Sequence, residues 1–395
     1  MLNLEELDKQ FVLQTYARDY TNFVRGENAT LFSEDGRDFI DFASGIGVSS
    51  VGHGNRRLSD AVCEQVRNII HISNLQVIEP QAKLAQKICE LSGYDGAIFF
   101  ANSGAEANEG AIKVARKYGE VNFDKKRYKV ITLEHSFHGR TISTLKATGQ
   151  KSFHTPSFSP YPDGFLYVKS IEDIYSSIDD ETVAVLIELV QGEGGVEPFS
   201  IGEVQNLAKF LRENGILLIV DEVQTGVFRT GEMLASNIYQ IEPDIITLAK
   251  GLGGGVPIGA ILTKHRDILK AGEHGSTFGG NYLSTRAGLE VLSILNGLYE
   301  SGELKETISY FEERLKGIRE RFSNLFSQDV GVGLMRGLRA EEADIPSKVV
   351  KSSMDSGLIV LKAGRNTVRF LPPLTISKSE IDKGFERFEK AISSI

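Results

Sequence analysis

Five consecutive aliphatic residues at 216–220 constrain the fold of this chain more than any other stretch. A strand with no polar break must be covered on both faces, which is typical of a parallel sheet in an α/β protein. Similar apolar runs occur at 183–190 and 245–248, and helical patterns such as 105–117 and 204–214 stand between the predicted strands. We therefore predict an α/β fold with a mostly parallel sheet.

The pattern changes after Tyr282. Two long helical stretches, 284–299 and 304–326, precede short strand and helix patterns that end in a helix from Ser379. A hairpin pattern at 29–42 has the same short-strand character. We predict a large domain at 53–283 and a smaller α+β domain made of 1–52 and 284–395.

Charge and composition exclude several classes of function. The net charge of −9 gives no general attraction to nucleic acid or to an anionic membrane. No apolar run approaches the roughly 20 residues needed to span a bilayer, and the first residues lack the basic and apolar regions of a secretory signal. Cys63 and Cys89 lie in helical patterns and form neither a CxxC pair nor a disulfide framework, so we expect buried thiols and a location in the cytoplasm.

Two polar residues follow neighbouring predicted strands, at the edge of an open sheet where ligands gather. Asp221 directly follows the run at 216–220, and Lys250 ends the next run before a glycine-rich turn. Alone, the acid is more often a helix cap or an ion-pair partner, and the lysine is more often exposed. Together they are typical of a pyridoxal phosphate (PLP) site, in which the acid keeps the ring nitrogen protonated and the lysine forms a Schiff base.

Three further positions have both a structural and a functional interpretation. Asn102, Ser103, Gly104 and Ala105 open a helix, where backbone N–H groups suit a phosphate or serve only as a cap. Phe137 stacks on a cofactor ring or belongs to the core, and Arg140 holds a carboxylate or lies on the surface. His135 and His138 have no further metal-ligating cluster, so no metal site is predicted. The glycines at 251–255 do not fit a dinucleotide-binding GxGxxG loop.

Six motifs in this order resemble the class-III PLP-dependent aminotransferases, and within that class the acetylornithine aminotransferases. They lie at 102–109, 136–141, 191–195, 221–226, 249–251 and 275–281. The resemblance covers nearly the whole chain, from Tyr16 to the last helix. It implies PLP-dependent transferase fold type I and a homodimer with shared active sites.

The resemblance also implies a role for each matching residue. Lys250 forms the Schiff base with PLP, and Asp221 pairs with its pyridinium nitrogen. The other PLP contacts that it implies are Phe137 and Val223 on the ring, Gln224 on the phenolic oxygen, Ser103, Gly104 and Ala105 on the phosphate, and the partner subunit's Thr277 on the same phosphate. Arg140 and Ser276 would hold the acylated ornithine, and Arg369 would take the α-carboxylate of glutamate in exchange for its partner Glu193.

The expected reaction moves the terminal amine of N2-acetylornithine to 2-oxoglutarate by ping-pong kinetics, in arginine biosynthesis. Ornithine, succinylornithine and 4-aminobutyrate remain alternative amine donors, because Gln76 stands where the family commonly has an aromatic residue beside the substrate channel. A PLP aminomutase and a non-catalytic PLP-fold binder are the other classes of function. The presence of both Lys250 and Asp221 argues against the non-catalytic binder.

Overall fold

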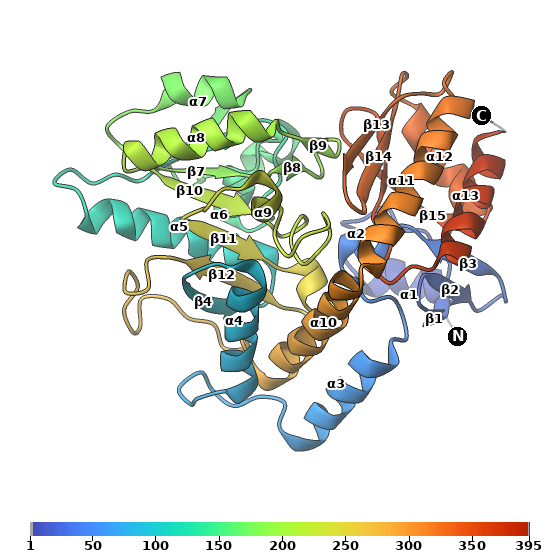
Figure 1. Cartoon of the computed structure of the whole chain (residues 1–395), viewed down its shortest axis with the longest axis horizontal. Coiled ribbons are helices and arrows are strands. Elements are labelled where there is room, and N and C mark those ends of the chain that lie inside the picture. Colours follow the sequence, from blue (N-terminus) through green and yellow to red (C-terminus); the bar gives the residue numbers. More distant parts are fainter. Residues whose placement is uncertain (1–2, 394) are drawn as a thin grey trace.

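The computed structural model describes residues 3–393 and 395. A seven-stranded sheet with the order β4-β12-β11-β10-β7-β5-β6 forms its larger part (Figure 1). β12 is antiparallel to β4 and β11, whereas the β11–β10, β10–β7, β7–β5 and β5–β6 pairs are parallel. The predicted α/β fold with a mostly parallel sheet is confirmed. The strands are β4 (Ala97–Ala101), β5 (Lys129–Leu133), β6 (Phe165–Val168), β7 (Thr182–Ile187), β10 (Leu217–Asp221), β11 (Ile245–Leu248) and β12 (Gly259–Thr263).

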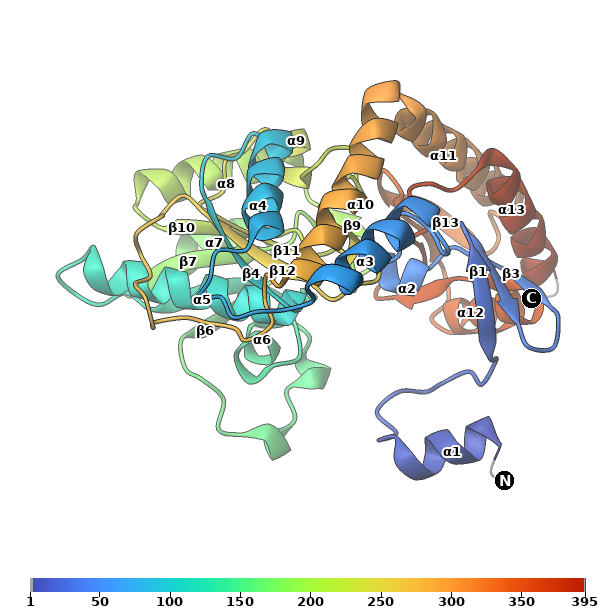
Figure 2. The ribbon, with the colours of Figure 1, turned by 90° about the horizontal axis from the view of Figure 1, so that it is seen from below.

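Helices cover both faces of this sheet, which explains why its central strands carry no polar break. Every residue of β7 and of β10 is buried. In β7, Ala184 and Leu186 pack in one cluster with residues of α5 (Gly104–Val121). Val185 and Ile187 pack in a second cluster with residues of α7 (Ile171–Ser177), α8 (Ile201–Glu213) and α9 (Ala235–Tyr239). Figure 2 shows α8 on one side of the sheet and α5 on the other.

Two four-stranded sheets form the other end of the molecule (Figure 1). The first has the order β1 (Phe23–Glu27), β2 (Thr30–Ser33), β3 (Asp38–Asp41) and β15 (Leu358–Ile359). The second has the order β13 (Phe326–Val332), β14 (Met335–Ala340), β17 (Thr367–Phe370) and β16 (Leu361–Ala363). β15 runs parallel to β3, with Leu358 beside Ile40, so the N-terminal hairpin joins the C-terminal part of the chain. The domain boundaries near 53 and 283 stay a prediction.

Helices hold the two ends together. α11 (Glu303–Arg321), α12 (Ile345–Asp355) and α13 (Lys378–Ile392) pack with the smaller sheets. α10 (Tyr282–Ser301) contacts α11 and also packs on α3 (Arg56–Asn68) and α4 (Glu79–Ser92), so it runs between the two ends (Figures 1 and 2). The short elements are α2 (Ser44–Gly47), α6 (Ile142–Ala147), β8 (Val190–Gln191), β9 (Glu197–Pro198) and three 3-10 turns at Lys151–Phe153, Pro156–Phe158 and Lys250–Leu252.

The N-terminal helix α1 (Leu4–Phe11) buries none of its residues and stands away from the rest of the chain in Figure 2. Across the part of the chain that the structure describes, no helix has both the length and the apolar character needed to cross a membrane.

Two predictions from the sequence are corrected. Cys63 is exposed and Cys89 is half-buried, so the expectation of buried thiols is wrong; α3, which carries Cys63, buries only Ala61. The apolar run at 183–190 is not one strand, because β7 ends at Ile187 and the next residue is the buried acid Glu188.

Candidate active site

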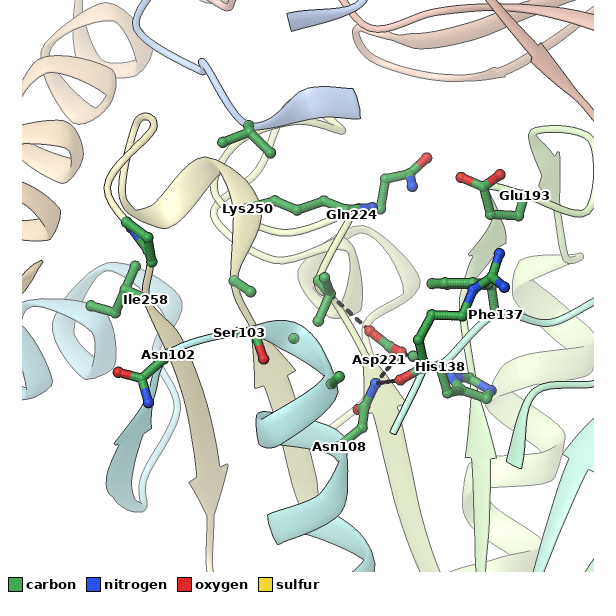
Figure 3. Close-up of a pocket in the computed structure, with 18 of the residues that line it drawn as sticks. Asn102, Ser103, Asn108, Phe137, His138, Glu193, Asp221, Gln224, Lys250 and Ile258 are labelled. Atoms are coloured by element: carbon green, nitrogen blue, oxygen red, sulfur yellow. Dashed lines mark hydrogen bonds and ion pairs between the residues drawn. The ribbon is translucent and has the colours of Figure 1, made fainter. Parts of the chain in front are cut away.

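A cavity of about 400 Å³ lies beyond the carboxyl ends of the large sheet (Figure 3). Its walls include residues at or just past the ends of four strands: Asn102 after β4, Glu188 after β7, Asp221 in β10 and Lys250 after β11. This is where ligands bind in open α/β sheets, and the volume suits a small cofactor. Ten of the residues singled out from the sequence line it: Ser103, Gly104, Ala105, Phe137, Arg140, Glu193, Asp221, Val223, Gln224 and Lys250.

Lys250 begins the 3-10 turn that follows β11, and its backbone φ is +41°. Residues with a side chain rarely adopt this left-handed conformation, and such strain gathers at functional sites. The turn is fixed from outside, because the carbonyl of Gly251 accepts a hydrogen bond from Ser50 Oγ at 2.7 Å. Removal from water lowers the pKa of the Lys250 amine to about 8, against the opposing effect of Glu193. The amine therefore becomes neutral, and nucleophilic, at a lower pH than an exposed lysine.

Asp221 is 4% exposed and is held from three sides (Figure 3). Its Oδ2 accepts from Asn108 Nδ2 at 2.7 Å and lies 2.8 Å from His138 Nδ1. Its Oδ1 accepts from the backbone N–H of Val223 at 3.0 Å. No ion pair among the described residues joins Asp221 to a lysine or arginine, so its charge is compensated only by neutral donors and by His138. A buried carboxylate in this state suits a cationic group of a ligand.

The start of α5 forms a second wall of the cavity. Ser103 is the N-cap, and its Oγ accepts from the N–H of Glu106 at 3.2 Å. The N–H groups of Gly104 and Ala105 have no acceptor within the helix, since the first turn offers none. A Cβ on Gly104 would lie 2.7 Å from Val223 Cγ1, so only glycine leaves this wall open. Free N–H groups and the helix dipole favour a phosphate here.

An arginine from the smaller sheets lies behind the cavity. Arg369, in β17, is 2% exposed, and its Nη1 donates to Glu193 Oε1 at 2.7 Å and to Gln224 Oε1 at 3.2 Å. Its Nε has no hydrogen-bond partner. Burial alone would raise the pKa of Glu193, but Arg369 outweighs that effect and lowers it, so the two side chains form an ion pair. A substrate carboxylate is the same chemical group as Glu193 and suits the same arginine.

Arg140 is exposed, and its guanidinium lies 3.8 Å from the ring centroid of Phe153 and 5.5 Å from that of Phe137. None of the ion pairs among the described residues includes Arg140. Stacking on aromatic rings orients a guanidinium and leaves its N–H groups free for a carboxylate.

Ser276 and Thr277 do not line the cavity of their own chain. Ser276 Oγ accepts from Asn102 Nδ2 at 3.0 Å and from the N–H of Gly279 at 2.9 Å, while Thr277 is exposed. Their roles in binding substrate and phosphate stay predictions.

Three polar residues of the cavity had no role in the sequence-based prediction. Asn108 and His138 orient Asp221, and Glu188 accepts N–H groups from two loops. Asn108 occurs within a matching motif, and an asparagine on the buried face of a helix pattern is a signal for a polar partner. His138 was weighed only as a metal ligand, and Glu188 was hidden inside an apolar run.

The cavity fits PLP on chemical grounds. The cofactor carries an aldehyde, a ring nitrogen and a phosphate. In one cavity the chain provides an amine with a lowered pKa at Lys250, a buried acid without an arginine or lysine partner at Asp221, and a helix N-terminus at Ser103.

Comparison with known sequences agrees with this geometry. The family model described as aminotransferase class-III matches residues 15–392. The acetylornithine aminotransferase of Wolinella succinogenes is 57% identical over 392 residues, which cover 99% of this chain and 100% of that protein. The acetylornithine aminotransferase of Caldanaerobacter subterraneus subsp. tengcongensis is 42% identical, with 98% of each chain covered.

Solved structures have the same fold. The N-acetylornithine aminotransferase of Stenotrophomonas maltophilia superposes with a TM-score of 0.84 at 31% identity, and 99% of each chain is covered. The ornithine aminotransferase of Toxoplasma gondii, with PLP at partial occupancy in its active site, superposes with a TM-score of 0.91 at 29% identity, covering 100% of this chain and 95% of that one. The chain therefore belongs to the class-III aminotransferases, a family of PLP-dependent enzymes.

Proposed function

We propose that this enzyme transfers the terminal amine of N2-acetylornithine to 2-oxoglutarate, giving N-acetylglutamate 5-semialdehyde and glutamate, in the arginine biosynthesis of the cytoplasm. One observation supports the aminotransferase chemistry most directly: Lys250, Asp221 and the start of α5 line one cavity. Arg369 pairs with Glu193 in the wall of that cavity. The choice of donor is supported by 57% identity over nearly the whole chain to a protein named acetylornithine aminotransferase.

In this proposal the cavity would hold PLP, and Lys250 would bind its aldehyde carbon. Ser103, Gly104 and Ala105 would hold the phosphate, and Asp221 would keep the ring nitrogen protonated. Phe137 and Val223 would contact the ring, and Gln224 its phenolic oxygen. When bound, PLP supplies an electron sink that stabilises negative charge on the carbon that bears the amine.

The chain itself supplies the proton transfers. When not bonded to the cofactor, the Lys250 amine would accept and return a proton, and its pKa of about 8 suits that role near neutral pH. Asn108, the backbone N–H of Val223 and His138 orient the Asp221 carboxylate for its proposed role at the ring nitrogen.

The two amine donors differ at the reacting carbon, since glutamate carries a carboxylate there and acetylornithine does not. We propose that Glu193 keeps Arg369 occupied for acetylornithine and releases it to the carboxylate of glutamate or 2-oxoglutarate. Their 2.7 Å ion pair supports this exchange. Glu193→Ala is expected to favour the glutamate half-reaction over the acetylornithine half-reaction. An unchanged preference between the two would refute the exchange.

Arg140 and Ser276 are proposed to hold the remaining end of the acylated ornithine. The free N–H groups of Arg140, stacked on Phe153, support the binding of a carboxylate. Thr277 is exposed and lies outside the cavity of its own chain. We therefore propose a homodimer in which the partner subunit's Thr277 completes the phosphate site; the exposed Phe278 beside it supports such an interface.

Mixed dimers test this sharing. Chains carrying Lys250→Ala and chains carrying Thr277→Ala are each expected to be impaired alone. If Thr277 acts across the interface, a mixed dimer contains one site with Lys250 and Thr277 both intact, so mixing the chains restores turnover. No restoration in a mixture shown by mass to contain mixed dimers would refute the shared site.

The amine donor is tested by assaying acetylornithine, succinylornithine, ornithine and 4-aminobutyrate side by side with 2-oxoglutarate. Acetylornithine is expected to give the highest kcat/KM. Equal or faster turnover of 4-aminobutyrate would overturn the proposed substrate. Turnover of one substrate without 2-oxoglutarate would instead indicate an aminomutase.

A further inference from the structure

Glu188 is a buried acid in the wall of the cavity, 6% exposed, between β7 and β8. Its Oε2 accepts the backbone N–H of Phe137 at 3.0 Å, and its Oε1 accepts that of Gly192 at 3.3 Å. No lysine or arginine pairs with it among the described residues. Burial raises the pKa of Glu188 to about 7, against the opposing effects of His138 and of the two backbone donors.

The two donors belong to two different parts of the site. Phe137 N–H lies in the loop that faces the cofactor ring in the proposed function. Gly192 N–H immediately precedes Glu193, the partner of Arg369. A single carboxylate therefore joins the loop at 136–141 to the turn at 191–195.

Two other contacts also restrict the movement of the turn at 191–195. A Cβ on Gly192 would lie 2.3 Å from Gln224 Oε1, so the turn packs directly on Gln224. On its other side, the carbonyl of Glu193 accepts the N–H of Gly364 at 2.8 Å. The Glu193 backbone is thus held between Glu188 of the large sheet and the segment that follows β16. Because Gly192 directly precedes Glu193, a shift of Gly192 is expected to move the carboxylate that pairs with Arg369.

We propose that Glu188 is a positioning residue that holds the loop at 136–141 and the turn at 191–195 together. Through this turn, Glu188 sets how readily Arg369 exchanges Glu193 for a substrate carboxylate. This inference rests on the proposed function. It predicts that loosening Gly192 withdraws Glu193 from Arg369, which favours glutamate over a donor with no carboxylate at the reacting carbon.

Glu188→Gln tests the two hydrogen bonds to Phe137 N–H and Gly192 N–H with almost no change in side-chain volume. An amide has one acceptor oxygen, and its NH2 group would face the second N–H, so one of the two bonds is lost. The two half-reactions are measured separately at pH 8.5, where Glu188 is ionised, in single turnovers of the holoenzyme. The ratio of kcat/KM for the amine donor to that for glutamate is expected to fall at least fivefold.

The Glu193→Ala background separates this role from a general structural one. With Glu193 absent, Glu188→Gln is expected to change the ratio by less than twofold, because the side chain that it positions has been removed. Equal losses in both half-reactions, or the same change of ratio in both backgrounds, would overturn the proposal. The donor is whichever amine the unaltered enzyme uses fastest, so a failure of acetylornithine counts only against the proposed substrate.

Glu380→Gln is the matched control. Glu380 also joins two separated segments, since Oε1 accepts from the N–H of Ala29 at 2.9 Å and Oε2 from that of Ser377 at 3.0 Å. It lies outside the cavity, so this variant is expected to lower the thermal stability and leave the ratio within twofold.

Two measurements without turnover complete the test. In the cofactor-free enzyme, Glu188→Gln is expected to speed the hydrogen exchange of the segment 189–196, and unchanged exchange would count against the proposal. If that variant does not fold, a crystal structure of the unaltered holoenzyme decides. Both N–H groups are expected within 3.5 Å of the Glu188 carboxylate in that structure, and a longer distance to either one overturns the proposal.

Discussion

Lys250→Met in the cofactor-free enzyme tests whether the folded chain keeps this amine out of water. The surroundings of Lys250 lower its pKa from 10.5 to about 8. One pKa unit corresponds to about 1.4 kcal/mol, so the lowering amounts to about 3 kcal/mol. The folded state binds the proton less tightly than the unfolded state. Protonated Lys250 therefore destabilises the fold below pH 8, and this effect disappears as the pH rises from 8 past 10.5.

Methionine has a similar length and no charge, so the variant removes the desolvated ammonium group and little else. Equilibrium urea unfolding at one protein concentration gives the free energy of unfolding at pH 7 and at pH 10. The variant is expected to be more stable than the unaltered chain by up to about 3 kcal/mol at pH 7. At pH 10 the amine is neutral in the folded state but still largely protonated in the unfolded state, so the difference is expected to shrink to about 1 kcal/mol.

Lys209→Met is the control, because Lys209 is an exposed lysine on α8 whose Nζ lies 4.0 Å from Glu213 Oε1. Its effect is expected to stay within about 0.5 kcal/mol at both pH values. If the gain of Lys250→Met were the same at pH 7 and at pH 10, the amine would not be desolvated in the folded state. The argument for a reactive lysine from its surroundings would then be wrong.

Two further substitutions probe the walls of the cavity. Gly104→Ala places a methyl group 2.7 Å from Val223 Cγ1; a titration of the cofactor-free enzyme is expected to show PLP affinity at least tenfold lower, whereas Gly297→Ala, in open space, leaves it unchanged. Asn108→Ala removes a donor at 2.7 Å from Asp221 Oδ2 and is expected to lower the free energy of unfolding by about 1–3 kcal/mol. A PLP affinity of Gly104→Ala within twofold of that of the unaltered chain would contradict the first expectation. Unfolding of Asn108→Ala at the same urea concentration as the unaltered chain would contradict the second.

The sheet was predictable from the sequence because its central strands are covered on both faces. Such coverage requires continuous apolar runs, and the runs at 216–220 and 245–248 became β10 and β11. The break within 183–190 was not foreseen, because Glu188 is one acid among seven aliphatic residues. Its place depends on the N–H of Phe137 as well as on that of nearby Gly192, and no local pattern encodes the contact with Phe137, 51 residues away along the chain.

The cavity was predictable for a similar reason. β10 and β11 are parallel neighbours, so residues that follow them meet at one edge of the sheet, as Asp221 and Lys250 do. Asn108 escaped the prediction because its partner Asp221 is 113 residues away along the chain. Thr277 lies outside the cavity of its own chain, so the role proposed for it would depend on a second subunit rather than on any local pattern.

The proposed chemistry and the proposed choice of substrate depend on different parts of the chain. The residues that would hold PLP belong to the large sheet and its loops, whereas Arg369 belongs to β17. Hydrogen bonds join the two parts: Ser50 Oγ binds Gly251 O beside Lys250, and buried Arg229 donates to the carbonyls of Leu334 and Pro372. Because these contacts set where Arg369 lies relative to Lys250, substitutions along them should change the preference between amine donors before they change the reaction itself.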